Sequence, residues 1–295
     1  MRVTVSLIQD EEQCHALWNH YADPEKFWER WDVRYAFHIP SWVFHFMLFK
    51  ENKKDIGLLP LVYHKKEKYY TFFGDTYPER NRFFASDNAG TIVMLNMCPR
   101  ETYLYNIETD DMALSANLSV SERRFFLPLD KYQSFEQYLA IFSKKHRKNF
   151  LNDLKKVQNI GIEIKKNVIK DFSILSSFNR QRFGSESDFS QPEFVMCMQA
   201  MLTLASTKGW LDLISIYVGG KPEAVGFGII YNKVYYVFNT GRNPAIANIG
   251  KYLIAEHINS AIAKKCVDID FLASETHWKV LWNLDSKELY EFVRN

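Results

Sequence analysis

One pattern of apolar and polar positions occurs twice in this chain, at residues 46–74 and again at residues 213–241. In each copy an apolar run leads into a lysine-containing polar turn, and a second apolar run ends at a tyrosine, Tyr63 or Tyr231. Another turn then precedes an aromatic segment that is closely followed by glycine. Short apolar runs separated by turn residues are typical of antiparallel strands, and the recurrence indicates an internal repeat. The pattern therefore predicts two copies of one three-stranded sheet.

The second copy continues into a regular succession of elements. Apolar residues at helical spacing, among them Leu253, Ile254 and Ile258, predict a helix, and shorter apolar runs predict strands. The expected order is three strands (211–218, 224–231 and 234–239), a helix (249–265), a strand (267–272), a short helix (276–282) and a last strand (288–293). Antiparallel hairpins are here followed by a crossover helix, and this order of elements indicates the topology of the sheet.

The remaining patterns predict further helices and strands of an α+β fold. Helices are expected at 13–34, along one long stretch at 134–159, from 171 onwards and at 192–208. Strands are expected at the N-terminus, at 124–129 and at 162–168, and the runs at 91–97 and 102–107 are interpreted as further elements of the first sheet. Pro128 confines its strand to an edge or to its end.

These elements predict two tandem domains. Each is a mixed, mostly antiparallel sheet flanked by helices, and a cleft lies between them. We place the boundary at residue 130, which gives domains of residues 1–130 and 131–295. Both are long enough to bury a core of their own.

Composition excludes several classes of protein. The chain is 47% hydrophobic and 16% aromatic, which favours packed sheets over disorder, and its net charge of +2 leaves no global nucleic-acid footprint. No apolar run approaches the roughly 18 residues that span a bilayer, and the N-terminus is expected to be a strand rather than a signal peptide. The four scattered cysteines predict free, mostly buried thiols in the cytoplasm and no metal site.

Three stretches carry a resemblance to a known family. They are SKKHRKNFLNDLKKV at 143–157, the loop after Gly241 with Pro244 and Gly250, and Asp-Phe-Leu at 270–272 followed by Trp-Lys-Val-Leu-Trp at 278–282. In this order they resemble the GNAT acyltransferase fold. More narrowly, they are similar to the tandem-GNAT group that contains the CelD-like (BioF-type) acetyltransferase domain and the Fem-type aminoacyltransferases. Ile249, Trp278 and Ala273 depart from the family pattern.

The resemblance implies an acyl donor site in the second domain. The donor would be acyl-CoA (acetyl-CoA or a longer acyl-CoA), a co-substrate rather than a permanently bound cofactor. Backbone N–H groups near Phe238, Asn239 and Thr240 would polarise the thioester carbonyl. In the Fem-type relatives the lysine that matches Lys279 neighbours the acyl carbonyl, which makes Lys279 a candidate for stabilising the oxyanion. The alternatives are an ordinary strand end and a solvated lysine whose stem covers Trp282.

A helix start is the second part of this site. The N-terminal N–H groups and dipole of the helix at 249–265 favour a pyrophosphate. The residues proposed to bind it are Asn248, Ile249, Gly250 and Lys251. The alternative is a plain helix start.

Several acids and a histidine could manage the acceptor amine. Asp270 lies in an apolar strand, so it must be paired or stand at the exposed end of the strand; it could hold Lys279 or orient an amine. Glu275 and His277 could each accept the proton of the amine, and histidine is the natural candidate near neutral pH. A lone loop histidine is more commonly just exposed.

Two other polar regions are candidate substrate sites. The basic residues of 143–157 form either a solvated helix face or a clamp for phosphate or carboxylate, which Arg147 would supply best. Apolar residues between them are expected to be needed for packing, which disfavours a membrane-surface role. Asp75 and Tyr77 follow Gly74 as Arg242 follows Gly241, so these loops could bind a cationic or amine-bearing acceptor or simply be solvated.

We predict an N-acyltransferase that moves an acyl group from acyl-CoA to an amine of a small-molecule or amino-acid-like acceptor by direct attack. The first domain would lie on the acceptor side, and the chain would be a monomer or a weak homodimer. The rivals are an aminoacyl-tRNA-dependent ligase of Fem type, in which tRNA would be the nucleic-acid partner, and a non-catalytic binding module.

Overall fold

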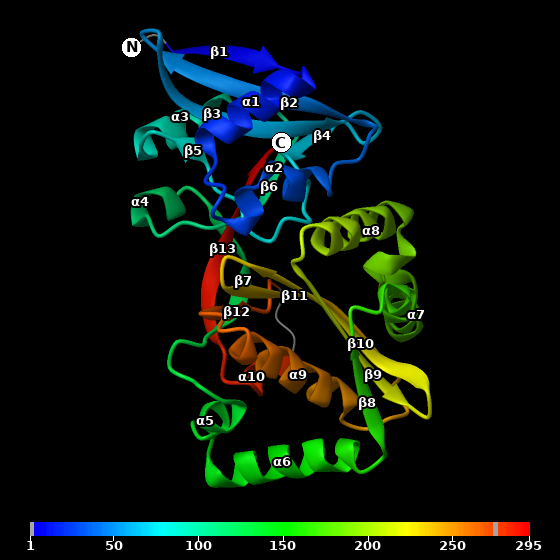
Figure 1. The fold of residues 1–295 in the computed structure, drawn as a ribbon. Coiled ribbons are helices and arrows are strands. Elements are labelled where there is room, and N and C mark those ends of the chain that lie inside the picture. The colour runs from blue at the N-terminus through cyan, green and yellow to red at the C-terminus, as the bar shows by residue number, and fades with distance from the viewer. Residues whose placement is uncertain (1–2, 274–276) are drawn as a thin grey trace. The chain divides into compact units, whose positions relative to one another are not determined.

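The structure, a computed structural model, describes residues 3–273 and 277–295. The chain divides into two compact units (Figure 1). The N-terminal unit comprises Met1–Arg124, Ala273–Glu275 and Lys287–Asn295, and the C-terminal unit comprises Phe125–Leu272 and Thr276–Ser286. The roles expected for residues 1–130 and 131–295 stay predictions.

The N-terminal unit is built on a mostly antiparallel sheet in the order β1-β2-β3-β4-β6-β13. Its strands are β1 (Val3–Ile8), β2 (Trp42–Glu51), β3 (Lys54–His64), β4 (Tyr69–Phe72), β5 (Phe84–Ala85), β6 (Thr102–Ile107) and β13 (Asp285–Arg294). Its helices are α1 (Glu11–Tyr21), the 3-10 turn η1 (Phe27–Glu29), α2 (Trp31–Tyr35), α3 (Asn88–Met97) and α4 (Met112–Ser115). The expected meander is present as β2-β3-β4, with β3 antiparallel to both neighbours.

Residues 91–97, expected to belong to the first sheet, form helix α3 instead. The Asp87 carboxylate accepts the N–H of Gly90 at 2.8 Å and caps the helix. Met94 and Leu95 are buried in the core, whereas Asn96 is exposed. Periodicity alone cannot distinguish a strand from a helix in a short apolar run. Here the Asp87 cap favours the helix.

The sheet of the N-terminal unit buries side chains on both faces. Alternate residues of β2 point to opposite sides, so that Phe46 packs with Trp18 of α1, while Met47 and Phe49 belong to a second cluster that includes Leu95 of α3. None of these side chains is more than 8% exposed. The two layers of helices thus cover a sheet that is apolar on both faces.

The C-terminal unit has a sheet in the order β7-β12-β11-β10-β9-β8. Its strands are β8 (Ile162–Lys166), β9 (Leu211–Val218), β10 (Lys221–Tyr231), β11 (Val234–Arg242), β12 (Asp268–Asp270) and the end of β7 (Ser119–Pro128), which belongs to the N-terminal unit up to Arg124. Its helices are α5 (Phe135–Leu139), α6 (Lys144–Gln158), α7 (Phe172–Phe183), α8 (Pro192–Thr207), α9 (Ile249–Ala263) and α10 (His277–Val280), and short 3-10 turns, η2 (Ile169–Asp171), η3 (Gly184–Glu186) and η4 (Asp188–Ser190), flank α7. The order β9-β10-β11-α9-β12-α10-β13 confirms the predicted β-β-β-α-β-α-β succession.

The helical stretch expected at 134–159 is two helices rather than one. Helix α5 ends at Leu139, and the Ser143 hydroxyl then accepts the N–H of His146 at 3.3 Å to start α6. Below the sheet, α6 packs on α9 (Figure 1). None of the helices in the described part of the chain has both the length and the hydrophobicity needed to cross a bilayer.

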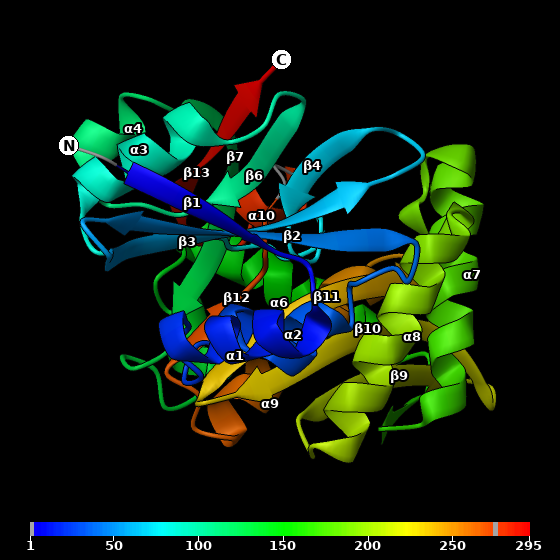
Figure 2. The same cartoon turned by 90° about the horizontal axis from the view of Figure 1, so that it is seen from above.

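Helices α7 and α9 cover opposite faces of the C-terminal sheet. Phe227 of β10 meets Phe172 of α7, with ring centroids 5.7 Å apart, while the adjacent residue, Gly226, faces His257 of α9. Neighbouring residues of a strand point to opposite faces, so the two helices lie on opposite sides. Helix α8 lies beside α7 (Figure 2).

A buried carboxylate joins α9 to the sheet. Asp212 of β9 has no exposed surface and accepts hydrogen bonds from Tyr235 at 2.7 Å, Ser260 at 2.6 Å, Lys264 at 3.2 Å and Lys166 at 3.3 Å. Burial alone would raise the pKa of Asp212, but the two hydroxyl bonds and the two lysine charges outweigh it and hold this pKa below its ordinary value. The ionised carboxylate is thereby fully satisfied.

Two glycines make room for this network. The Tyr235 hydroxyl donates to Asp212 and lies 2.7 Å from Nδ1 of His257, which is fully buried. Burial lowers the pKa of His257 to about 4, so the imidazole is neutral near pH 7. A Cβ at Gly226 would overlap the His257 ring, and one at Gly228 would overlap the Tyr235 hydroxyl.

We expect Gly226→Ala to destabilise the protein by about 1–3 kcal/mol, because the buried His257 ring has no room to move away from the new methyl group. Chemical denaturation of wild type, Gly226→Ala, His257→Ala and the double variant forms a cycle that isolates this clash. In the His257→Ala background the alanine at 226 should cost much less. An equal cost in both backgrounds would contradict the proposed clash.

Candidate functional site

Strand β11 leaves its parallel neighbour at the candidate donor site. The described pairing of β11 with β12 runs over Val234–Tyr236, whereas β11 itself continues to Arg242. On the other side, Phe227 pairs with Asn239 and Gly228 with Val237, so Phe238 is the extra residue of a β-bulge. The family resemblance implies that the carbonyl-polarising N–H groups lie among Phe238, Asn239 and Thr240, and this range includes the bulge. Each of these three residues is half-buried.

Helix α7 closes tightly on the end of β11. The side-chain amide of Asn179 donates to the carbonyl of Thr240 at 3.1 Å. A Cβ on Gly241 would lie 2.5 Å from the carbonyl oxygen of Leu175, so glycine is required here for close packing of strand and helix. The glycine that follows the aromatic segment of the repeat is therefore a packing residue in the C-terminal unit.

The start of α9 is shaped by its first residues. Asn248 adopts a left-handed conformation (φ 63°) and its side chain makes no capping hydrogen bond, while Ile249 is fully buried and anchors the first turn. A Cβ on Gly250 would lie 2.5 Å from Cδ of Arg242. Arg242 therefore crosses the first turn of α9, which brings a residue expected to bind the acceptor next to the expected pyrophosphate site.

A second arginine acts on Arg242 through its charge. Burial lowers the pKa of Arg242, and like-charge repulsion from Arg182 on α7 lowers it further. The charges of Arg242 and Arg182 add to the positive N-terminal end of α9, a helix of 15 residues. The electrostatic potential at the start of α9 is therefore positive. Such an arrangement suits an anion with several oxygens, because arginine binds phosphate oxygens in pairs.

Lys251 has a partner other than the one expected. Its ammonium group lies 2.6 Å from Oδ2 of Asp153 on α6 and 5.3 Å from the centre of the Phe150 ring. Half-buried pairs of this kind join packed helices. Lys251 therefore ties α9 to α6 in the structure, and Arg242 takes its place across the helix start.

Asp270 and Lys279 both hold the backbone of Leu272. Asp270 is 1% exposed, and its carboxylate accepts the N–H of Leu272 at 2.9 Å. Lys279 is 3% exposed, donates to the carbonyl of Leu272 at 3.1 Å and lies 5.0 Å from the centre of the Phe125 ring. Leu272 itself has φ +62°. Lys279 is thus not the solvated lysine of the alternative interpretation, and a buried lysine in such a cluster is a functional-site candidate.

Three further residues were proposed from the sequence: His277, Glu275 and Arg147. His277 begins the short helix α10, although its side chain lies outside the described part of the structure. Glu275 lies outside the described residues. Arg147 lies on the same side of α6 as the buried Phe150 and Leu154, and it is half-buried. It is therefore set apart from the exposed lysines of the same helix.

The N-terminal unit contains a buried carboxylate that the sequence also singled out. Asp75 follows Gly74 in a left-handed conformation (φ 62°), and its side chain is 11% exposed. Its Oδ1 is buried, has no hydrogen-bond partner and lies 3.7 Å from Nε2 of His64. The His64 ring stacks against Tyr69 at 4.1 Å and also contacts Trp42.

Burial also shifts the protonation of this cluster. Burial raises the pKa of Asp75 to about 6, although hydrogen bonds from Thr71 and Thr76 oppose the shift. Burial also lowers the pKa of His64 to about 4. Near pH 7 the pair is therefore an ionised, poorly satisfied carboxylate beside a neutral imidazole. Tyr77, the other residue expected to bind the acceptor here, packs near Phe37 with ring centroids 5.8 Å apart.

Comparison with known families identifies the C-terminal region. Residues 144–280 match a family model described as an acetyltransferase (GNAT) domain. This region is a GNAT domain. The matched residues include the bulged strand, the start of α9 and the Asp270–Lys279 cluster. The match covers residues 144–280, just under half of the chain, so it identifies this region and not the whole chain. No curated protein matches the sequence.

Solved structures extend the same fold over the whole chain. A structure titled FemX has 11% identity and a TM-score of 0.60, and the alignment covers 98% of this chain and 97% of that one. A tandem GNAT protein from the clavulanic acid biosynthesis pathway has 9% identity and a TM-score of 0.56, with 98% of both chains covered. L-PGS from Bacillus licheniformis has 11% identity and a TM-score of 0.55, with 97% of this chain and 92% of that one covered. These similarities confirm the tandem-GNAT fold.

Arg182 and Asn179 are residues of this GNAT domain that sequence reasoning missed. Both lie on α7, about 60 residues before the strand end that they approach. Their only sequence signal is their position in the last two turns of a predicted helix, which does not indicate what they contact. In the described part of the chain, no group of three or more histidine, cysteine or acidic side chains is arranged to hold a metal ion.

We expect Asp75→Asn to stabilise the protein at pH 8 by about 2 kcal/mol, because asparagine removes the buried charge. A carboxyl group whose pKa rises on folding from 3.8 to about 6 adds stability that is complete below pH 3.8 and is lost as the pH rises through 6. Wild type should therefore lose stability across this window and the variant should not. Thermal unfolding between pH 4 and pH 8 measures the difference.

The matched control is Asp110→Asn, since the side chain of Asp110 is 89% exposed. This control should follow the pH dependence of wild type. If Asp75→Asn also followed it, the Asp75 carboxyl would not titrate as its burial requires.

Proposed function

We propose that this protein is an N-acyltransferase that transfers an acyl group from acyl-CoA to an amine of a small-molecule or amino-acid-like acceptor. One observation carries the proposal: the start of α9, crossed by Arg242, follows a bulged strand that diverges from its neighbour. The proposal is supported because the residues that would form an anion site and those that would supply backbone donors belong to consecutive segments of one GNAT domain.

The diphosphate of the donor would bind at the first turn of α9. The N–H groups around Asn248, Ile249 and Gly250 would face its oxygens, and Gly250 would allow them to approach closely. Arg242 and Arg182 would supply the positive charge that the sequence assigned to Lys251. The donor is a co-substrate that binds and leaves in each cycle.

Transfer would proceed by direct attack. The neutral amine forms a bond to the thioester carbonyl carbon, the carbonyl oxygen becomes an oxyanion, and the amine proton passes to a base. Collapse of this intermediate breaks the carbon–sulfur bond, and the thiol leaves with a proton. Backbone N–H groups near Phe238–Thr240 would stabilise the oxyanion, assisted by Lys279. His277 or Glu275 would accept the proton.

Asp270 would act as a positioning residue in this scheme. It holds the N–H of Leu272, whose carbonyl in turn holds the Lys279 ammonium group. The chain supports an acceptor role for residues 1–130 through Asp75 and Tyr77, because a partly satisfied carboxylate near aromatic rings suits an ammonium group. Arg147, half-buried on α6, would bind a phosphate or carboxylate of a substrate. We further propose a cytoplasmic protein that is a monomer or a weak homodimer.

The similarity to FemX supports an alternative function of Fem type. In this alternative the donor is an aminoacyl-tRNA rather than acyl-CoA. This alternative uses the same fold and a different donor site. It predicts that tRNA, and no CoA compound, stabilises the protein. A non-catalytic module would be stabilised by a ligand without turning it over.

We expect CoA, acetyl-CoA and longer acyl-CoAs to raise the melting temperature of the protein, because ligands that bind only the folded state stabilise it. Arg242→Gln should weaken acetyl-CoA binding about 10- to 100-fold, which corresponds to loss of one charge-assisted phosphate contact. Isothermal titration measures this change. Arg100→Gln, at an exposed position, is the matched control. Absence of stabilisation by every CoA compound would overturn the proposed donor.

We expect Lys279→Met to lower kcat about 100- to 1,000-fold with little change in the KM for acyl-CoA, because the charge would act mainly on the oxyanion. Methionine keeps the buried aliphatic stem, so the melting temperature should fall only slightly. Steady-state kinetics of thiol release tests this. Lys233→Met, at an exposed turn, is the control. Unchanged kcat in folded Lys279→Met would remove this residue from the mechanism.

A further inference from the structure

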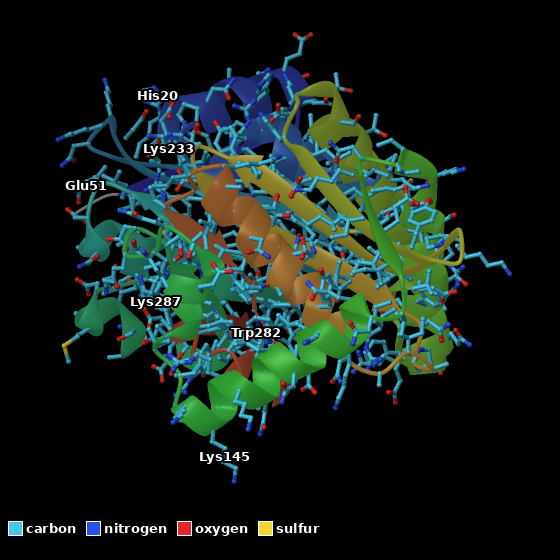
Figure 3. All side chains as sticks on the ribbon, turned by 60° about the horizontal axis from the view of Figure 1, so that its bottom comes forward. His20, Glu51, Lys145, Lys233, Trp282 and Lys287 are labelled. Atoms are coloured by element: carbon cyan, nitrogen blue, oxygen red, sulfur yellow. The ribbon has the colours of Figure 1, made fainter. Side chains whose placement is uncertain are left out.

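Helix α6 presents two chemically different faces. Its inward side buries Phe150, Leu154 and Val157 in the core of the C-terminal unit. Its outward side carries a row of exposed lysines at helical spacing: Lys144, Lys145, Lys148, Lys155 and Lys156. Figure 3 shows Lys145 pointing away from the domain.

Only one acid of the helix lies beside the lysine row. Asp153 is the only acidic residue of α6, and its side chain is 23% exposed. One of its oxygens is held by Lys251 of α9 at 2.6 Å, and Lys156 lies 3.8 Å from the other. Asp153 therefore belongs to the packing between the helices, and the outward face retains a strong positive charge.

Exposed aliphatic side chains lie within and around this row. Leu151 is 47% exposed between the lysines, and Ile141 (43%) and Ile160 (45%) stand just beyond the two ends of the helix. Within residues 143–157, Phe150, Leu154 and Val157 are buried as the sequence predicts, and Leu151 is the exception. Val280 and Leu281, also exposed, precede Trp282, whose ring packs edge-on against Phe150 with centroids 4.7 Å apart.

We propose that the outward face of α6 docks on the surface of an anionic phospholipid bilayer. A straight helix of 15 residues offers a row about 22 Å long, which a plane of phosphate groups can meet at every lysine. Lysine ammonium groups can lie at the phosphates while Leu151, Ile141 and Ile160 enter the headgroup layer. The helix would lie along the surface without crossing it.

The composition of the face favours a bilayer over other polyanions. Protein–protein interfaces are depleted in lysine and have an apolar centre, whereas here the lysines occupy the centre. Single-stranded nucleic acids are bound through aromatic side chains that stack on bases, and the exposed apolar residues of this helix and its flanks are aliphatic. Lysine also lacks the planar fork with which arginine reads phosphates in pairs.

The test is sedimentation of the full-length protein with vesicles. The protein should pellet with vesicles of phosphatidylcholine and phosphatidylglycerol (about 70:30) in low salt and remain in the supernatant with phosphatidylcholine alone. Salt of about 0.5 M should release most of it, because the charges are exposed and therefore screened. Absence of pelleting with the anionic vesicles in low salt would overturn the proposal.

Substitutions localise the binding to the helix. The triple variant Lys144→Gln, Lys148→Gln and Lys155→Gln should bind anionic vesicles about 100-fold more weakly, since each lysine near such a surface contributes about fivefold. Glutamine retains helix propensity, so the fold should be unaffected, as circular dichroism can verify. The matched control removes the same charge elsewhere in the unit: Lys221→Gln, Lys233→Gln and Lys265→Gln, all at exposed positions.

The control variant should lose little binding. An equal loss in both triple variants would show that net charge, rather than α6, attracts the membrane, and this would overturn the proposal. Leu151→Gln should weaken binding a few-fold even where salt has screened the lysines. If the α6 lysines instead controlled binding to tRNA in a gel-shift assay and left vesicle binding unchanged, the face would be a nucleic-acid surface and not a membrane surface.

Discussion

The buried carboxylate of Asp212 is the interaction on which the geometry of the GNAT domain depends. It receives two hydroxyl groups and two ammonium groups, of which Ser260 and Lys264 come from the C-terminal end of α9. Removing one partner would leave the buried charge less well compensated, which costs more than the net gain from forming that hydrogen bond. The C-terminal end of α9 is therefore fixed to the sheet.

The first turn of α9 is fixed separately, by the buried Ile249 and by the Lys251–Asp153 pair. A helix held at both ends presents its N-terminal N–H groups in a constant direction, and an anion site requires this constancy.

Close approach is the second constraint, and glycine satisfies it in three places. Gly226 and Gly228 admit the side chains of the network, and Gly241 admits the backbone of α7. In each case a methyl group would displace a neighbour that is itself buried. The glycine that follows the aromatic segment in both copies of the repeat is thus needed for packing in the second half. At Gly74 the conformation does require glycine, since φ is +97° there.

The tandem fold could be predicted from the sequence because strands, turns and helices leave local, periodic patterns of apolar and polar residues. Alternating runs and turn residues identified both meanders, and they identified the crossover helix to within two residues at its C-terminal end. Prediction was wrong where a single cap decides between structures, as Asp87 does for α3 and Ser143 does for the break before α6.

The side-chain partners in the candidate site could not be predicted from local patterns. Lys251 meets Asp153 across 98 residues of sequence, and Arg182 approaches Arg242 from another helix. A helical pattern fixes which face a residue occupies, but it does not say which element that face meets.

Helix α6 shows how one element can serve two surfaces without conflict. Because an α-helix has 3.6 residues per turn, the buried side chains and the lysine row lie on opposite sides of α6. Substitutions on one side can therefore occur independently of the other.

Asp153 lies between these two sides. By neutralising Lys251 it lets α9 pack against α6 without burying a bare charge. By contacting Lys156 it also draws one outward lysine toward the core. Replacing Asp153 would therefore disturb the start of α9 and strengthen the outward charge together, whereas replacing the outward lysines would change the charge alone. The domain core and its outer surface are coupled through this one carboxylate.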